Sequence, residues 1–217
     1  LKGLTIINGI KPTKDELEAF SFNVEPVLCE ESTAQELLGS VDLILLSPGI
    51  PREKASLDLA HKNKVKIWNE IEWCSRGFSG EVIAITGTNG KTTTVTFLDL
   101  AFKEAGVRTV TGGNIGIPFS TIYHQRDQVD LVLLEMSSFQ CESLEEFRPS
   151  IAGYLNLFAN HGERYESVEG YRLAKWDLVK NQKEGDLTFC GPGTGKPPIE
   201  IKSTTIDMPS FWEKELE

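Results

Sequence analysis

Short apolar runs and stretches of helical period alternate along this chain. Apolar runs predict strands at Leu4–Ile7, Val41–Leu46 and Val65–Trp68, and helical spacing predicts a helix from about Glu53 to Lys62. Alternation of this kind is typical of a parallel sheet covered by helices on both faces. The run Arg76–Gly80 breaks the pattern and predicts a linker.

A second unit of the same kind follows the linker. The run Val82–Ile85 predicts a strand, the residues from Gly87 to Gly90 a turn, and those from Thr92 to Ala105 a helix that Gly106 is placed to end. The apolar stripe of this helix consists of Val95, Leu98, Phe102 and Ala105. Later strands are predicted at residues 107–110, 129–134, 151–155 and 187–189, with a helix at about 168–180. No clear period follows Cys190, so nothing is assigned there.

Composition narrows the class of protein. A chain of 217 residues with 40% hydrophobic and 25% charged residues is typical of a globular protein with one large domain or two modest ones. No apolar run has the length of a membrane span, so we expect no membrane insertion. The net charge of −10 argues against binding of nucleic acid, because that binding depends on basic groups that neutralise phosphates.

The cysteines bear on the cellular compartment of the protein, and the N-terminus bears on whether the chain is complete. Four cysteines without Cys-x-x-Cys spacing argue against disulfides or a zinc site, and we expect reduced thiols in a cytoplasmic protein. The chain starts without Met and without the apolar region of a signal peptide, which indicates that it begins partway through a longer protein.

The segment Thr86–Thr92, with the sequence Thr-Gly-Thr-Asn-Gly-Lys-Thr, lies between a predicted strand and a predicted helix, as a phosphate-binding loop requires. Lys91 would reach the terminal phosphates of a nucleotide, and the Thr92 hydroxyl would bind Mg²⁺. The usual first glycine is replaced by Ile85, and a plain glycine turn is the alternative. The predicted ATP-binding residues are Gly87, Thr88, Asn89, Gly90, Lys91, Thr92 and Thr93.

These features predict an α/β fold of two consecutive parallel-sheet units. The first is an incomplete Rossmann-like domain, and the second is like a P-loop ATPase. We place the first domain at residues 1–76, the linker at 77–80 and the second domain at 81–217.

A second glycine-rich stretch, Gly191–Lys196, is superficially similar to the phosphate loop. It is followed by Pro197 and Pro198 and lacks the hydroxyl that would bind a metal. Consecutive prolines favour extended chain over a helix that caps phosphate. We therefore interpret it as an ordinary loop.

Four motifs in this order and spacing resemble the Mur ligase family, and within it the members that add D-glutamate: Ser47–Pro51, Thr86–Thr92, Gly112–Gly116 and Glu135–Gln140. The resemblance extends from about Asn8 to Asn181. It implies an ATP-dependent ligase that joins UDP-N-acetylmuramoyl-L-alanine to D-glutamate through an acyl phosphate, in peptidoglycan precursor synthesis.

Candidate metal ligands follow two predicted strands. Glu135 ends a buried strand at the carboxyl edge of the sheet, where it can reach Mg²⁺, although such a residue can also cap a helix. Taken alone, His161 is more typical of a surface or packing residue than of a metal ligand. The resemblance implies that it binds a second Mg²⁺, because Asn156, Arg164 and Tyr165 also match. Asn160 departs from the family's usual Asp and removes a negative charge.

Lys175 lies on a predicted helix beside the apolar stripe of Tyr171, Ala174 and Leu178, so its amine should be partly desolvated. A neutral amine can react with CO₂. The resemblance implies a carbamylated Lys175 that helps to hold Mg²⁺. A lysine whose stem lies on apolar surface while its amine stays in water is the alternative.

The substrate side is carried by motifs near the ends of strands. The Ser47-Pro48-Gly49 turn could hold the uridine diphosphate, or could be only a tight turn. Asn114 between glycines could contact phosphate or substrate, or could equally be a turn residue. The resemblance adds Ser137, and Asn8 at a position where the family commonly has Asp.

Two segments of the family pattern have no counterpart. No glycine-rich strand-turn-helix precedes Leu4, and no C-terminal domain follows Glu217, so we expect a fragment that binds nucleotide but does not complete ligation. We expect the parent protein to be a monomer. The alternatives are a Mur-type ligase with a different amino-acid acceptor and a non-catalytic protein that only binds nucleotide.

Overall fold

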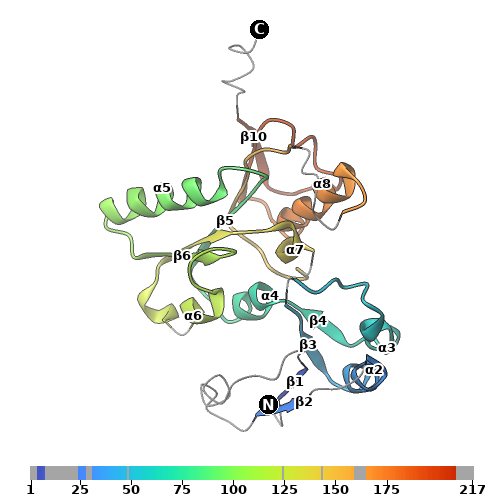
Figure 1. Cartoon of the computed structure of the whole chain (residues 1–217). Helices are drawn as coiled ribbons and strands as arrows, with labels where there is room; N and C mark the ends of the chain where they lie inside the picture. The colour runs from blue at the N-terminus through green and yellow to red at the C-terminus, as the bar shows by residue number, and fades with distance from the viewer. Residues whose placement is uncertain are drawn as a thin grey trace. The chain divides into compact units, whose positions relative to one another are not determined.

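The computed structural model describes residues 4–7, 24–27, 31–47, 49–123, 125–142, 144–158 and 165–208 (Figure 1). Two compact units are present, one formed by Leu1–Ile44 with Ile50–Ile67 and the other by Leu45–Gly49 with Trp68–Glu217. Helix α4, Glu70–Ser75, belongs to the second unit. The domain limits at residues 76 and 81 stay a prediction.

The first unit contains short strands and helices. Its elements are β1 (Leu4–Ile7), β2 (Val24–Val27), α2 (Glu31–Gly39), the 3-10 helix η1 (Ala55–Leu57) and α3 (Asp58–Lys62). β1 and β2 are parallel. Strand β3, Leu43–Leu45, pairs with β4, Lys66–Trp68. β3 is shorter than the sequence predicts because Val41 and Asp42, both exposed, lie outside it.

The second unit is built on a six-stranded sheet with the order β10-β9-β8-β5-β7-β6. The strands are β5 (Glu81–Thr86), β6 (Thr109–Gly113), β7 (Leu131–Glu135), β8 (Ile151–Tyr154), β9 (Leu187–Cys190) and β10 (Thr204–Asp207). Each neighbouring pair is parallel. β10 lies in the region that the sequence left unassigned.

Helices cover both faces of this sheet (Figure 1). Besides α4 they are α5 (Lys91–Glu104), α6 (Phe119–Tyr123), α7 (Ser138–Cys141) and α8 (Val168–Trp176), with the 3-10 turns η2 (Arg126–Gln128) and η3 (Asp177–Val179). In the part of the chain that the structure describes, no helix is long and apolar enough to span a bilayer.

Side chains of β5 alternate between two cores, as the period of a strand requires. Ile83 and Ile85 pack with Val95 of α5, whereas Val82 and Ala84 belong to the larger core on the other face. The stripe predicted for α5 is confirmed at Val95, Leu98 and Phe102. It was wrong at Ala105, which is the exposed C-cap residue of the helix.

The chain order explains where a ligand can bind. β5 is central, the chain continues from it to β6 on one side, and β8, β9 and β10 lie on the other side. Open α/β sheets bind ligands at the carboxyl ends of the strands where the order reverses in this way. The predicted phosphate loop follows β5 at this position.

Candidate functional site: a phosphate loop with a carboxylate and two lysines

The loop between β5 and α5 depends on its two glycines. Gly87 has φ +146° and Gly90 has φ +84°, values that side-chain-bearing residues rarely adopt. Gly90 is the N-cap of α5 and offers no side chain to cap the helix. The positive end of α5 therefore faces this loop without a competing side-chain acceptor from its N-cap, as in a phosphate-binding loop.

The segment after β8 fixes the loop from the side. Asn156 accepts a hydrogen bond from the Asn89 backbone NH through Oδ1 and donates one to the Asn89 carbonyl through Nδ2, both at 3.0 Å. The Asn156 carbonyl accepts from the Thr88 NH at 3.1 Å, and the Phe158 NH donates to the Thr88 hydroxyl at 3.1 Å. These four hydrogen bonds fix the shape of the loop.

Two lysine amines converge on one carbonyl of the loop. Lys91 Nζ donates to the Gly87 carbonyl at 3.0 Å, and Lys175 Nζ donates to the same carbonyl at 3.2 Å. Lys175 is 2% exposed, and its amine lies 4.4 Å from the centre of the Tyr171 ring. Two lysine side chains that donate hydrogen bonds and a helix N-terminus at one loop favour an anion such as triphosphate.

Glu135 connects the loop to the neighbouring strand. Its buried carboxylate accepts a hydrogen bond from the Thr92 hydroxyl at 2.7 Å and another from Asn114 Nδ2 at 3.0 Å. The Asn114 NH also donates to the Glu135 carbonyl at 2.8 Å. Gly113 makes this approach possible, because a Cβ there would lie 2.4 Å from the Glu135 carbonyl oxygen and its φ is +100°.

The donor set fits magnesium bound together with a nucleotide. Mg²⁺ prefers oxygen ligands and is usually held by one or two carboxylates plus substrate phosphates. Thr92 and Glu135 supply a hydroxyl and a carboxylate oxygen in contact with each other. No group of three or more His, Cys, Asp or Glu side chains suited to a metal occurs in the described part of the chain.

Other predicted site residues are placed differently. Ser137 is the N-cap of α7, and it forms a capping box with Gln140, so its hydroxyl already has a structural role. Ser47 and Gly49 are exposed residues after β3, and Thr93 is exposed in the first turn of α5. Asn8, Pro48, Asn160, His161 and Arg164 lie outside the described residues. The roles assigned to all of these residues stay predictions.

A buried thiol lies behind the loop. Cys141 is fully buried, and this burial raises the pKa of its thiol to about 12 although the positive charge of Lys175 acts in the opposite direction. At neutral pH it is a protonated, unreactive thiol.

The clamp formed by Asn156 was missed as a structural device. Its only sequence signal is an amide, able to donate and accept at once, placed directly after a predicted strand.

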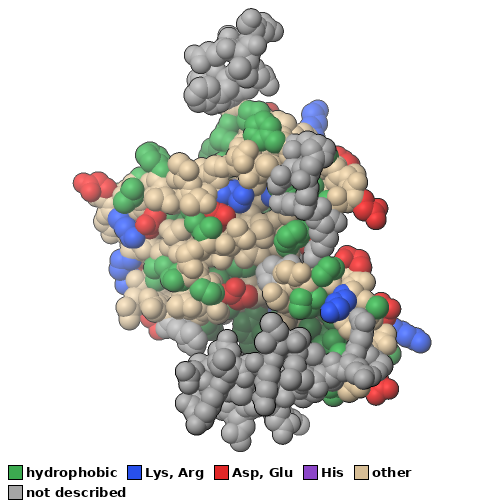
Figure 2. Space-filling model, in the orientation of Figure 1, with side chains coloured by type: hydrophobic (Ala, Val, Ile, Leu, Met, Phe, Trp, Pro, Cys, Tyr) green, Lys and Arg blue, Asp and Glu red, His purple; other side chains and the backbone are tan. Residues whose placement is uncertain are grey.

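A pocket of about 320 Å³ at the ends of β9 and β10 contains none of the predicted site residues. On the face drawn in Figure 2, the described basic side chains are scattered rather than gathered in one patch.

The chain is similar in sequence to known proteins. Residues 85–191 match the family model of the Mur ligase middle domain. The UDP-N-acetylmuramoylalanine--D-glutamate ligase of Alkaliphilus metalliredigens (strain QYMF) is 37% identical over 185 residues, which are 83% of this chain and 41% of that protein. The protein of the same name from Citrifermentans bemidjiense is 41% identical over 177 residues, or 80% of this chain and 39% of that protein.

This chain thus spans about two fifths of the length of these curated relatives. Among solved structures, the UDP-N-acetylmuramate:L-alanyl-gamma-D-glutamyl-meso-diaminopimelate ligase from Neisseria meningitides has a TM-score of 0.55 and 17% identity, and the match covers 94% of this chain and 68% of that one. This likeness concerns the fold alone, and it confirms the α/β prediction. The similarity of the curated relatives, together with the matched middle domain, establishes that the chain belongs to the Mur ligase family.

Proposed function

We propose that this chain is the nucleotide-binding core of an ATP-dependent ligase that joins D-glutamate to UDP-N-acetylmuramoyl-L-alanine in peptidoglycan precursor synthesis. The observation that carries the proposal is the meeting of the Thr92–Glu135 pair with Lys91 and Lys175 at one glycine loop. The curated relatives with this printed name support the choice of substrates.

The reaction has two displacements. A carboxylate oxygen of the uridine nucleotide substrate attacks the γ-phosphorus of ATP, ADP leaves, and an acyl phosphate forms. The amine of D-glutamate then attacks the acyl carbon, phosphate leaves, and the nitrogen loses a proton. The first step brings two anions together, and Mg²⁺ supplies the charge neutralisation when bound.

Five residues have a part in this proposal, namely Lys91, Thr92, Glu135, Asn114 and, outside the described residues, His161. The loop backbone and Lys91 bind the terminal phosphates, which also stabilises charge that develops on them. Thr92 and Glu135 hold Mg²⁺, and Asn114 orients the Glu135 carboxylate through the hydrogen bond that it donates. His161 is the proposed ligand of a second Mg²⁺.

Lys175 is the proposed site of a carbamate. Its neutral amine adds to the carbon of CO₂, so that an N–C bond forms, one C=O bond becomes a C–O⁻ single bond and the nitrogen releases one proton. The product would be an anionic carbamate whose oxygens could bind Mg²⁺. Burial to 2% exposure supports this reaction because it favours the neutral amine. The position of Nζ beside Gly87 would put the new oxygens near the phosphates.

The uridine side and the setting complete the proposal. Asn8 and the Ser47-Pro48-Gly49 turn would hold the uridine diphosphate, and Ser137 would lie near the substrate. We place the parent protein in the cytoplasm, where nucleotide precursors and ATP are available. We propose that it is a monomer.

The test uses the longer protein that we expect to contain this chain. Phosphate release should require ATP, UDP-N-acetylmuramoyl-L-alanine and D-glutamate together. A panel of other amino acids distinguishes a ligase with a different acceptor. Absence of release with every amino acid, together with intact ATP binding, would instead support a non-catalytic nucleotide-binding protein.

Matched variants test the residue roles. Thr92→Val should abolish magnesium-dependent turnover, whereas Thr96→Val, at an exposed position one turn further along α5, should not. Lys91→Ala should abolish nucleotide binding. Lys175→Ala should lose turnover but keep much of the ATP affinity, and short carboxylates added to the assay should restore part of the rate. No rescue together with an unmodified Lys175 by mass spectrometry of the native protein contradicts the carbamate.

A further inference from the structure

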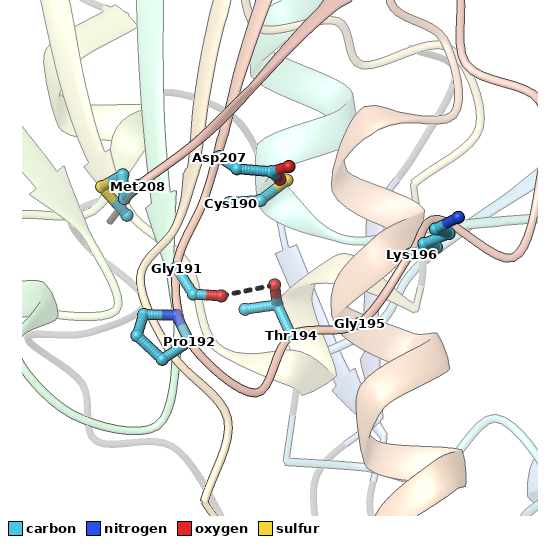
Figure 3. A pocket seen from close by; sticks show the side chains of 8 residues that line it. All are labelled: Cys190, Gly191, Pro192, Thr194, Gly195, Lys196, Asp207 and Met208. Carbon is cyan, nitrogen blue, oxygen red and sulfur yellow. Dashed lines mark hydrogen bonds between the residues drawn. The ribbon is translucent and has the colours of Figure 1, made fainter. Parts of the chain in front are cut away.

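The second glycine-rich loop, Gly191–Lys196, follows β9 at the same edge of the parallel sheet as the phosphate loop. Figure 3 shows it along one side of the pocket, with the Thr194 hydroxyl directed at the Gly191 carbonyl, to which it donates a hydrogen bond of 2.8 Å. Thr194 is 1% exposed. The loop is therefore closed on itself and anchored by the buried Gly191 and Thr194, while Gly193, Gly195 and Lys196 are exposed.

One side of this loop holds the segment that clamps the phosphate loop. The Leu157 NH donates to the Pro192 carbonyl at 3.2 Å. A Cβ on Gly191 would lie 1.7 Å from the Leu155 carbonyl oxygen, and one on Gly193 would lie 2.7 Å from the Leu157 carbonyl oxygen. The glycines thus let two backbones run against each other on either side of Asn156.

The other side of the loop holds helix α8. The indole NH of Trp176 donates to the Thr194 carbonyl at 3.1 Å, and Arg172 Nη1 donates to the Lys196 carbonyl at 2.8 Å. Trp176 is 1% exposed, and it also packs edge-on against Tyr154 at the end of β8, with ring centres 5.3 Å apart. The part of α8 that carries Lys175 is fixed by these contacts.

We propose that Gly191–Lys196 is a positioning element that holds Asn156 and Lys175 in their places around the phosphate loop. Thr194 of the loop and its partner Trp176 of α8 are the positioning residues. The glycines serve close packing against carbonyl groups, not phosphate binding. This inference rests on the proposed nucleotide binding for its affinity readout and on the proposed ligase activity for its turnover readout.

The two sides of the element predict separable effects. Trp176→Phe removes the indole donor and loosens α8, so turnover should fall about tenfold while the Kd for ATP changes by less than about twofold, because displacement of a reacting group by about 1 Å can cost up to about 100-fold. Gly193→Ala pushes on Leu157 and should raise the Kd for ATP about tenfold by disturbing the Asn156 clamp.

The control is Thr188→Val in the same strand as Cys190. Thr188 is fully buried and its hydroxyl lies 3.1 Å from that of Ser203, so the variant loses buried polar contacts earlier in β9. It should lower the melting temperature as much as the other two variants, with turnover and the Kd for ATP unchanged.

The experiment measures melting temperature, ATP affinity and turnover for wild type and the three variants in the longer protein. Separate losses, turnover in Trp176→Phe and affinity in Gly193→Ala, support the positioning element. The proposal is overturned if the changes in all three variants run parallel and follow melting temperature. It is also overturned if both Trp176→Phe and Gly193→Ala behave as wild type. Wild-type protein without turnover would refute the proposed ligase instead, and the affinity of Gly193→Ala would still decide the clamp.

Discussion

Replacement of Gly113 by alanine is expected to damage both the stability of the sheet and the magnesium site. Gly113 has φ +100°, and an added Cβ would meet the Glu135 carbonyl oxygen at 2.4 Å. That oxygen belongs to backbone and cannot move aside by a rotamer change. The strand end that carries the Glu135 carboxylate must therefore shift.

The magnitude follows from comparison with Gly106, which ends α5. Gly106 also has a positive φ, of +81°, but nothing lies within 4 Å of an added Cβ. Both alanine variants carry a backbone cost of about 1–3 kcal/mol for the conformation. Only Gly113→Ala adds the steric conflict, which costs about 2 kcal/mol. For a protein of this size that difference corresponds to a melting temperature lower by about 4–8 °C.

The assay pairs thermal unfolding with magnesium titration of nucleotide binding. In Gly113→Ala, displacement of Glu135 and of its partner Asn114 should lower the affinity for Mg²⁺ about 10–100-fold, as loss of supporting contacts does at other metal sites. Gly106→Ala should bind as wild type. Equal melting temperatures for the two variants, with unchanged Mg²⁺ dependence, would refute the reasoning about Gly113.

Three further predictions concern groups outside the loop. Glu72 is fully buried, and its carboxylate accepts hydrogen bonds from the backbone NH groups of residues 145–147. Glu72→Ala should therefore lower the free energy of unfolding, measured in urea, by about 3 kcal/mol, whereas Glu146→Ala, at an exposed side chain, should lower it by about 0.5 kcal/mol or less. Burial raises the pKa of the Asp186 carboxyl, but hydrogen bonds from Arg148 and the Lys183 NH outweigh this effect and lower the pKa. Wild type should therefore be more stable than Asp186→Asn by the full amount above about pH 4, and this advantage should shrink as the pH falls further through the lowered pKa. An advantage that persists in acid contradicts the prediction. Burial raises the thiol pKa to about 12 at Cys74 and Cys141 and to about 11 at Cys190. In a Cys29→Ser background, a thiol reagent at about pH 8 should therefore label the protein only after unfolding. Rapid labelling of the folded protein would refute this prediction.

Local pattern was enough to predict the central elements of the site. A strand, a glycine turn and a helix are specified by neighbouring residues, and the adjacency of Lys91 and Thr92 at the helix start places both at the loop. The helical period placed Lys175 next to an apolar stripe, and the structure shows it buried with Tyr171 and Ala174. These inferences need only spacings of a few residues.

Pairing between distant segments was decided by the tertiary structure. β10 has four exposed residues, so no apolar alternation marks it, and its place in the sheet comes from backbone pairing with β9. The same is true of the Asn156 clamp and of the support that Gly191–Lys196 gives it, since in both a side chain binds backbone groups of a distant segment, and every residue carries such groups. Side-chain pattern in the sequence records burial and local conformation, whereas the partner of a backbone NH or carbonyl is fixed only when the strands assemble.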